Sequence, residues 1–269
     1  MATATVAAIL TGIVSLSGTA EARNTASGPA RQKPTIVLEH GAFADASSWT
    51  GVIERLTRAG YPVVAAANPL RGPAADAAYL RSVLDRVAGP VILVGHSYGG
   101  TVMSEAAVGR EKKVKALVYV AAFLPDQGET SLGLSNKFPG STLGNAVEAV
   151  PYALPDGGSG NDLYIKSDKF RAQFAADVPR GQSAIMAATQ RPIAASALEE
   201  PSVGAAWKSI PTWSLIATQD FNIPPAAQRF MSKRAHAHTV EVKASHAVAV
   251  SHPDAVARVV RQAADSTTR

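Results

Sequence analysis

The chain has 269 residues, of which 46% are hydrophobic and 17% charged, so it can bury a sizeable core and global disorder is excluded. It contains no cysteine, which excludes disulfides, thiolate metal sites and cysteine nucleophiles. The net charge is +5, but Lys and Arg are scattered, and the densest basic run, residues 110–115, also contains an acid. We therefore expect a solvated helix end in that run and no nucleic-acid-binding surface.

The first 33 residues differ in composition from the rest. Residues 5–18 are apolar and small, and residues 20–22 (Ala-Glu-Ala) fit the cleavage pattern of a signal peptide. The run is too short and too often interrupted to span a membrane, so no stable membrane insertion is expected. We interpret residues 1–33 as a signal peptide and linker, which predicts export to the periplasm or the medium. Because no Lys or Arg precedes the run, a disordered extension of a cytoplasmic protein is the alternative.

Short apolar runs alternate with helical periodicity from Pro34 to Ala122, a pattern typical of β-α-β units and a parallel sheet. Apolar stripes predict helices that end near Gly60 and Gly89, and a third helix is expected from residue 101 to residue 109. The expected strands cover residues 35–39, 63–67, 91–95 and 114–121. Residues 91–94 are consecutively apolar, which indicates a strand buried on both faces.

The rhythm changes from residue 125 to residue 211, where Pro and Gly are frequent and apolar periodicity is weak and local. We interpret this segment as a cap of short helices and loops, inserted into a core that consists of residues 34–124 and 212–269. Sheet rhythm returns at residues 213–218 and 239–243. Helices are expected from the Pro224-Pro225 pair to Arg234 and over residues 253–263, with proline suited to the first turn.

The strongest chemical signal is Gly95-His96-Ser97-Tyr98-Gly99-Gly100, which contains the G-x-S-x-G pattern of a nucleophile elbow. A buried strand is expected to end at Gly95 and a helix to begin near Thr101, which is the strand-turn-helix setting that the pattern requires. Glycines on both sides of the serine avoid a collision across so sharp a turn. Ser97 is therefore predicted to be a nucleophile.

A serine hydroxyl needs a base, and in this template the base is a histidine that follows both the serine and an acid along the chain. That order argues against His40 and His96. His246 follows the strand at residues 239–243 by a short loop, on the sheet edge where the nucleophile lies, and is the predicted base. His252 precedes a proline at a helix start, where a capping or surface role is expected. The remaining two, His236 and His238, are expected at the surface.

The acid is expected after the strand at residues 213–218, which leads directly to Asp220. Asp126, after the strand at residues 114–121, is the competing candidate, although its setting also fits a turn. The developing oxyanion needs backbone N–H donors. We expect them at Tyr98, which follows the nucleophile, and at Ala42, in a loop that Gly41 allows to fold back on Ser97.

With these residues the chain resembles the α/β-hydrolases, in the branch of plant methyl esterases, hydroxynitrile lyases and small bacterial esterases. The matching segments are residues 38–43, 93–100, 116–123, 218–220 and 245–246. The resemblance implies an α/β-hydrolase fold, that is, a mostly parallel central sheet flanked by helices, with a helical cap inserted after the sixth strand. It also implies that the cap covers the pocket and that neither a metal nor an organic cofactor is needed. One departure is Glu39, where many members have valine.

The resemblance also indicates the reaction. Lyases of this branch carry Thr and Lys where this chain has Gly41 and Ala247, so hydrolysis is expected. We predict a Ser-His-Asp enzyme that cleaves a small-molecule carboxylic ester through an acyl-enzyme, with Phe43 and Met186 in contact with substrate. A lactonase or C–C bond hydrolase with the same triad is an alternative. A ligand-binding protein on the same fold is a second alternative, against which the complete triad argues. The sequence predicts no oligomeric state.

Overall fold

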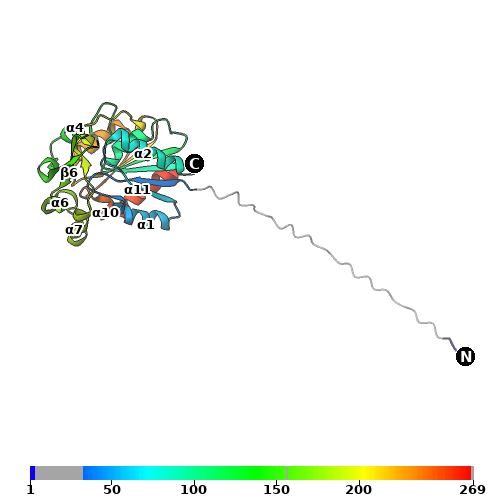
Figure 1. The fold of residues 1–269 in the computed structure, drawn as a ribbon. Helices are drawn as coiled ribbons and strands as arrows, with labels where there is room; N and C mark the ends of the chain where they lie inside the picture. The colour runs from blue at the N-terminus through cyan, green and yellow to red at the C-terminus, as the bar shows by residue number, and fades with distance from the viewer. Residues whose placement is uncertain (4–32, 156, 268–269) are drawn as a thin grey trace. The chain divides into compact units, whose positions relative to one another are not determined.

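The computed structural model describes residues 1–3, 33–155 and 157–267. The chain divides into residues 1–31 and residues 32–269, and the fold is that of the second part (Figure 1). The apolar segment at residues 5–18 and the Ala-Glu-Ala pattern at residues 20–22 lie outside the described residues. Within the described residues, no helix is both long and apolar enough to cross a membrane.

A six-stranded sheet forms the centre of the fold, in the order β2-β1-β3-β4-β8-β9. Every neighbouring pair of strands is parallel. The strands are β1 (Thr35–Glu39), β2 (Val63–Ala66), β3 (Val91–His96), β4 (Val114–Val120), β8 (Thr212–Ala217) and β9 (His238–Val242). The predicted parallel sheet is confirmed, and β3, which lies between β1 and β4, is buried along its whole length as its apolar run indicates.

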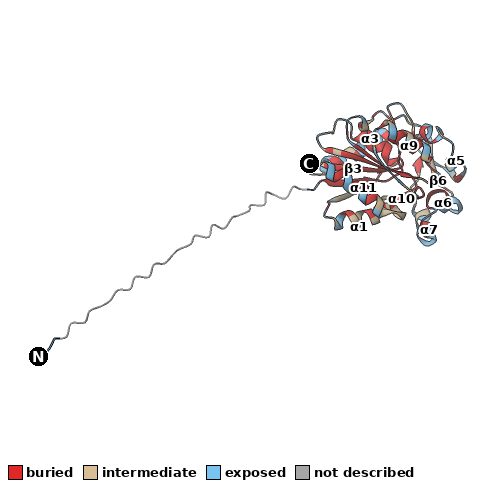
Figure 2. Cartoon of the chain, turned by 180° about the vertical axis from the view of Figure 1, so that it is seen from behind, coloured by how far each residue is buried: buried red, intermediate tan, exposed pale blue. Residues whose placement is uncertain are grey.

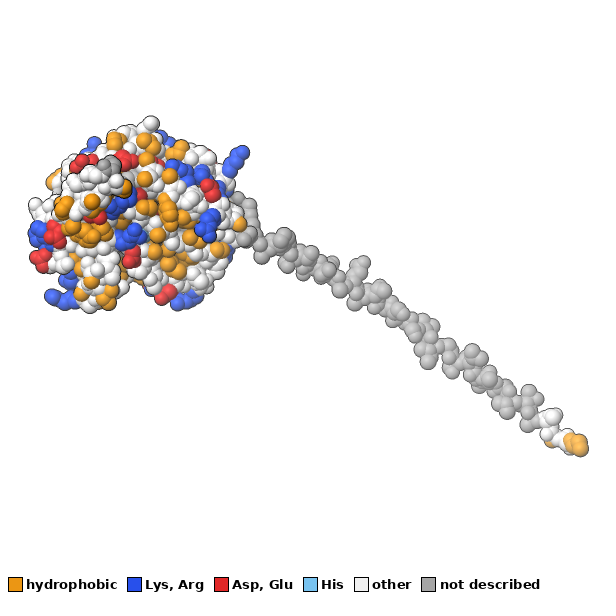
Figure 3. Space-filling model, viewed as in Figure 1, with side chains coloured by type: hydrophobic (Ala, Val, Ile, Leu, Met, Phe, Trp, Pro, Cys, Tyr) orange, Lys and Arg blue, Asp and Glu red, His pale blue; other side chains and the backbone are white. Residues whose placement is uncertain are grey.

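Helices cover both faces of this sheet (Figure 2). On one face, α1 (Thr50–Arg58) packs on α11 (Pro253–Ser266), and both share a core with the side chains of Ile36 and Leu38. The core on the other face is shared by α2 (Pro73–Arg86), α3 (Gly99–Ala106) and α9 (Pro225–Arg234). In the space-filling view, acidic and basic side chains are interspersed across the visible face of this fold (Figure 3).

The segment between β4 and β8 contains both helices and strands. Its helices are α4 (Ser131–Asn136), α5 (Leu143–Ala146), α6 (Ser167–Phe174), α7 (Arg180–Thr189) and α8 (Ala195–Glu199). Its strands, β5 (Val147–Ala153), β6 (Ser159–Ile165) and β7 (Ile193–Ala194), form a separate antiparallel sheet in the order β5-β6-β7.

Two expectations about this cap are wrong. The cap is not purely helical, because β5 and β6 form a hairpin whose sequence does not look like strands. Proline at position 151 is tolerated because β5 is an edge strand, and most of β5 is exposed, so its apolar pattern is weak. The cap also follows β4, the fourth strand along the described chain, and not the sixth. The family resemblance implies six strands before the cap, whereas the sequence has only four strand-like segments before residue 125.

Glu39, the departure from the family pattern, is the last residue of β1 and is fully buried. Neither of its carboxyl oxygens has a hydrogen-bond partner among the described residues. Burial raises the pKa of Glu39 well above its ordinary value, and the nearby carboxylate of Asp76 raises it further. Because the folded state holds the proton more tightly, Glu39 stabilises the fold at low pH and loses that contribution as the pH rises through its raised pKa.

The variant Glu39→Gln does not titrate at this position. Its free energy of unfolding, relative to that of the wild type, is therefore expected to increase as the pH is raised above the ordinary pKa of glutamate and toward the raised pKa of Glu39. Urea denaturation at a series of pH values measures this difference. Glu54→Gln, at an exposed position of α1, is the control, and its difference from the wild type should be flat over the same range. A flat profile for Glu39→Gln would contradict the prediction.

Candidate active site

Ser97 lies in a sharp turn between β3 and α3, with its backbone in the left-handed region at φ 53°. A non-glycine residue is uncommon in that region, and strain of this kind persists only when the surroundings impose it. The flanking glycines are required by close backbone packing. A Cβ atom on Gly95 would lie 2.7 Å from the Gly99 carbonyl oxygen, and one on Gly99 would lie 2.5 Å from the Glu39 carbonyl oxygen.

The three residues predicted as a triad meet at the carboxyl edge of the sheet. Ser97 follows β3, Asp220 follows β8 and His246 follows β9, so parallel strands deliver them to one edge. The Ser97 Oγ atom lies 2.9 Å from His246 Nε2, and His246 Nδ1 lies 2.7 Å from Asp220 Oδ2. A carboxylate only accepts, so Nδ1–H donates to Asp220 and Nε2 is left to accept the Ser97 proton.

Asp220 is held by donors on both carboxylate oxygens. Oδ1 accepts from the backbone N–H groups of Asn222 at 2.7 Å and Ile223 at 3.0 Å. Oδ2 accepts from the Gln228 side-chain amide at 2.9 Å in addition to His246. The competing candidate, Asp126, is instead paired with Lys208 at the surface. The structure therefore brings Asp220, and not Asp126, to the histidine.

Two other histidines are buried beside the site and remain neutral. His96 Nε2–H donates to the His246 carbonyl at 2.9 Å, and burial, assisted by His246, lowers the pKa of His96 to about 3. His40 donates through Nδ1 to the Gly41 carbonyl and accepts the Asn68 backbone N–H at Nε2. Burial is also the main cause that lowers the pKa of His40 to about 4. Both rings therefore orient backbone segments of the site without adding charge.

The loop after β1 lies directly against Ser97. A Cβ atom on Gly41 would lie 2.6 Å from Ser97 Cβ, so only glycine fits at this approach. In the described part of the chain, the backbone N–H groups of Ala42 and Tyr98 donate to no protein acceptor, and both residues line the cavity that holds Ser97. The Tyr98 hydroxyl donates to Asp76 at 2.8 Å, so that side chain is engaged elsewhere. Two unengaged backbone donors beside Ser97 are what an oxyanion hole requires.

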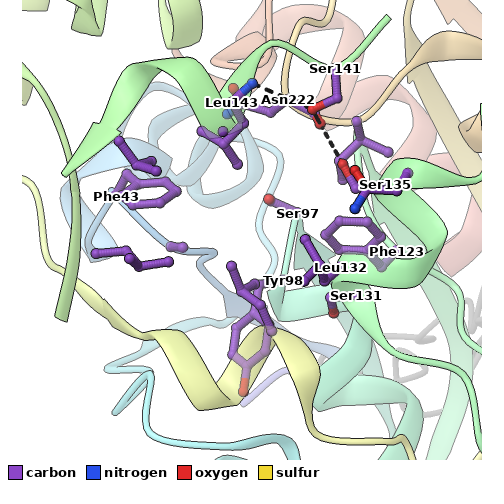
Figure 4. A pocket seen from close by; sticks show the side chains of 17 residues that line it. Phe43, Ser97, Tyr98, Phe123, Ser131, Leu132, Ser135, Ser141, Leu143 and Asn222 are labelled. Carbon is purple, nitrogen blue, oxygen red and sulfur yellow. Dashed lines mark hydrogen bonds between the residues drawn. The ribbon is translucent and has the colours of Figure 1, made fainter. Parts of the chain in front are cut away.

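The Ser97 hydroxyl projects into a cavity of about 210 Å³, between the rings of Phe43 and Phe123 (Figure 4). Among the described residues that line this cavity, none is Asp, Glu, Lys or Arg. On its far wall, the hydroxyls of Ser135 and Ser141 both donate to the Asn222 backbone carbonyl at 2.9 Å. The lining residues are Ala42, Phe43, Ser97, Tyr98, Phe123, Ser131, Leu132, Ser135, Asn136, Ser141, Leu143, Gly144, Val147, Leu163, Leu198, Asn222 and Ile223.

Comparison with known proteins identifies the family of the chain. The sequence profile of the alpha/beta hydrolase family matches residues 36–259. The chain belongs to the alpha/beta hydrolase family. It is 29% identical to a pyrethroid hydrolase of Sphingobium wenxiniae over 86% of this chain and 88% of that protein. It is 27% identical to the alpha/beta hydrolase nvfD of Aspergillus novofumigatus, over 86% of this chain and 97% of that protein. The crystal structure of polyneuridine aldehyde esterase superposes with a TM-score of 0.75 at 19% identity, over 86% of this chain and 99% of that chain.

The cap of this alpha/beta hydrolase also holds the loop that carries His246. The Phe174 carbonyl, at the end of α6, accepts the Ala247 backbone N–H at 2.9 Å and the Ser245 hydroxyl at 3.2 Å. The Asp177 carboxylate accepts the Ser245 backbone N–H at 3.2 Å and its hydroxyl. The Phe174 ring packs edge-to-face on the His246 ring, with 4.9 Å between centroids. Sequence reasoning missed these contacts because they join segments about 70 residues apart.

The two residues expected to contact substrate in this hydrolase are placed differently. Phe43 lines the Ser97 cavity as expected. Met186, on α7, is not among the lining residues of that cavity, but lines a neighbouring cavity that Phe43 also lines. Met186 is half-buried against the core beneath the cap. The contact of Phe43 and Met186 with substrate stays a prediction.

Proposed function

We propose that this hydrolase cleaves neutral carboxylic esters through an acyl-enzyme on Ser97. The observation that carries the proposal is the buried hydrogen-bond chain from Asp220 through His246 to Ser97. A serine hydroxyl beside a histidine whose other nitrogen is fixed by a carboxylate is an activated nucleophile. The unengaged N–H groups of Ala42 and Tyr98 supply the second requirement of acyl transfer, stabilisation of the oxyanion.

The geometry supports the following sequence. His246 Nε2 takes the Ser97 proton while Oγ attacks the ester carbonyl carbon, and the carbonyl oxygen becomes an oxyanion at the Ala42 and Tyr98 N–H groups. The bond from carbon to the alcohol oxygen then breaks, and His246 gives its proton to that oxygen. Water repeats the attack on the acyl-enzyme, and the acid leaves. The Asp220 carboxylate accepts the hydrogen bond from Nδ1 and stabilises the imidazolium each time it forms.

The cavity and the relatives support an uncharged ester. A charged group in a cavity without a charged partner would lose its hydration without compensation, so carboxylate-bearing or cationic substituents are disfavoured there. The relatives reported above include proteins named as an esterase and as a pyrethroid hydrolase.

A fluorophosphonate probe tests the proposal, because it phosphonylates only an activated serine. We expect labelling at Ser97, mapped by peptide mass spectrometry, together with hydrolysis of p-nitrophenyl acetate and butyrate. Ser97→Ala should lose both signals, whereas Ser209→Ala, at an exposed serine, should keep both. An unlabelled wild-type protein that hydrolyses neither ester would instead be a binding protein on a hydrolase fold.

Gly41→Ala is expected to lower kcat for p-nitrophenyl butyrate by about 10²- to 10³-fold, the loss typical of one missing oxyanion donor. The added Cβ atom collides with Ser97 Cβ and with the His96 carbonyl oxygen at 2.8 Å, which pushes the Ala42 N–H away from the oxyanion. Steady-state kinetics measures the loss. Gly144→Ala, where a Cβ atom meets no atom within 4 Å, is the control for added volume at the cavity wall. Equal activity of the two variants would contradict an oxyanion role for the Gly41 loop.

We also propose that the protein is exported, on the basis of the apolar run at residues 5–18 and the Ala-Glu-Ala pattern that follows it. Amino-terminal sequencing of protein recovered outside the cytoplasm of its native host tests this. A mature chain that starts near Arg23 is expected. Recovery of the protein only in the cytoplasm, with residues 1–22 still attached, would overturn the proposal.

A further inference from the structure

A second cavity, of about 320 Å³, lies next to the Ser97 cavity. Its core side is the segment that follows β1, including the short helix η1 (Ala46–Trp49), and its cap side is α7. Met186 on α7 and Val250 on α10 (Val248–Ser251) contribute apolar side chains, and the side chain of Ile185 is exposed at its rim. Its polar part consists of Asp45, whose carboxylate accepts the Ser47 backbone N–H at 2.7 Å, and of six Ser, Thr or Gln residues.

Of the residues that the structure describes, Phe43 alone lines both cavities, so its ring is the partition between them. Its backbone is in the left-handed region at φ 60°, and its N–H donates to the Arg191 carbonyl of the cap at 2.9 Å. The ring packs edge-to-face on Phe174, which in turn packs on His246. A non-glycine residue in the left-handed region is strained, and the surrounding contacts hold Phe43 in this conformation. The partition is therefore a fixed feature next to the reacting atoms.

The position of His246 indicates on which side of Ser97 the alcohol half of a bound ester lies. The oxygen of the leaving alcohol must lie near His246 Nε2, because that atom protonates it as the acyl–oxygen bond breaks. The chain runs from His246 directly into α10, and Val250 of that helix lines the second cavity. No residue of the His246 loop or of α10 lines the Ser97 cavity, whose wall comes instead from α4, α5, β5 and the Asp220 loop.

We propose that the second cavity binds the alcohol half of the ester, while the Ser97 cavity binds the acyl half. This inference rests on the proposed function, which it extends to the substrate class: esters of a bulky, uncharged, largely hydrophobic alcohol. Such an alcohol would lie along the Phe43 ring, with its body against Met186 and Val250 and its oxygen at His246. After proton transfer from His246 it leaves through the cavity's exposed rim near Ile185.

Two ester series measured on the full chain test the proposal. The first keeps butyrate and varies the alcohol from methanol to 2-naphthol; the second keeps p-nitrophenol and varies the acyl chain from acetyl to octanoyl. Met186→Trp and Gln182→Trp each fill the second cavity, and Gln182 is exposed, so its variant should fold normally. Val150→Trp, at an exposed position of β5 that lines neither cavity, is the matched control.

We expect both filling variants to lower the kcat/KM ratio of 2-naphthyl butyrate to methyl butyrate by about 10-fold or more, the range that pocket contacts typically control. The dependence on acyl length should stay as in the wild type, and Val150→Trp should change neither series. An unchanged ratio in both filling variants, or a changed acyl-length dependence, would overturn the assignment of the two cavities. Failure of the proposed function is a distinct result, because the wild type would then hydrolyse neither series and Ser97 would resist the fluorophosphonate.

Discussion

Replacing His246 with alanine is expected to lower kcat for ester hydrolysis by about 10⁶-fold, close to the loss expected for the Ser97 replacement. His246 Nε2 is the hydrogen-bond acceptor 2.9 Å from the Ser97 hydroxyl, and without it the serine must attack as a neutral alcohol. The same atom returns the proton to the leaving alcohol, so both halves of the reaction lose their proton carrier. The losses from Ser97→Ala and from His246→Ala should therefore not add in the double variant.

His252→Ala is the matched control for this prediction. His252 was the other candidate base once His236 and His238 were expected at the surface, but its Nδ1 atom contacts Ser251 Oγ at 2.9 Å and its side chain is partly exposed. Its replacement should leave kcat within a few-fold of the wild type. Steady-state kinetics with p-nitrophenyl butyrate, with circular dichroism to verify folding, decides between them. A large loss in His252→Ala with little loss in His246→Ala would reverse the assignment.

The sequence predicted the central sheet and the order of the site because both depend on local signals. The apolar run of β3, the glycines around Ser97 and the chain order Ser, acid, His are visible without any long-range contact. The position of His246 followed from one further rule, that parallel strands present their carboxyl ends at one sheet edge. These residues meet in the structure as expected.

The features that the sequence did not predict depend on contacts between distant segments. Nothing local distinguishes Gln228 on α9 as a donor to Asp220, or Asp177 in the cap as an acceptor for Ser245. The β5–β6 hairpin was missed because an exposed edge strand with a proline lacks the usual strand pattern. Glu39 departs from the family pattern, and the sequence alone does not explain it. In the structure Glu39 is buried and its pKa is raised, with Asp76 contributing to the rise, so ionisation of Glu39 destabilises the folded state.

Asp220→Asn is expected to lower kcat by about 10⁴-fold, because all four groups that contact the Asp220 carboxylate are hydrogen-bond donors. An asparagine has one carbonyl oxygen and one NH₂ group, and the NH₂ must then face donors. If its oxygen keeps the backbone N–H groups of Asn222 and Ile223, the NH₂ faces His246 Nδ1. The imidazole would then adopt the other tautomer, in which Nδ1 accepts from the NH₂ group and Nε2 carries the proton. In that tautomer Nε2 can no longer accept the Ser97 proton.

Because the other tautomer of His246 blocks proton transfer and not binding, the effect of Asp220→Asn is expected on kcat. Asn222 and Ile223 line the cavity, and an asparagine at position 220 whose oxygen keeps their two N–H groups leaves that wall in place, so KM should change far less than kcat. Asp126→Asn is the control, because Asp126 pairs with Lys208 at the surface, and its kcat should match that of the wild type. Kinetics of both variants with p-nitrophenyl butyrate gives the comparison. If Asp126→Asn loses activity and Asp220→Asn keeps it, the acid follows β4, and the hydrogen bond between Asp220 and His246 is not the one that orients the base.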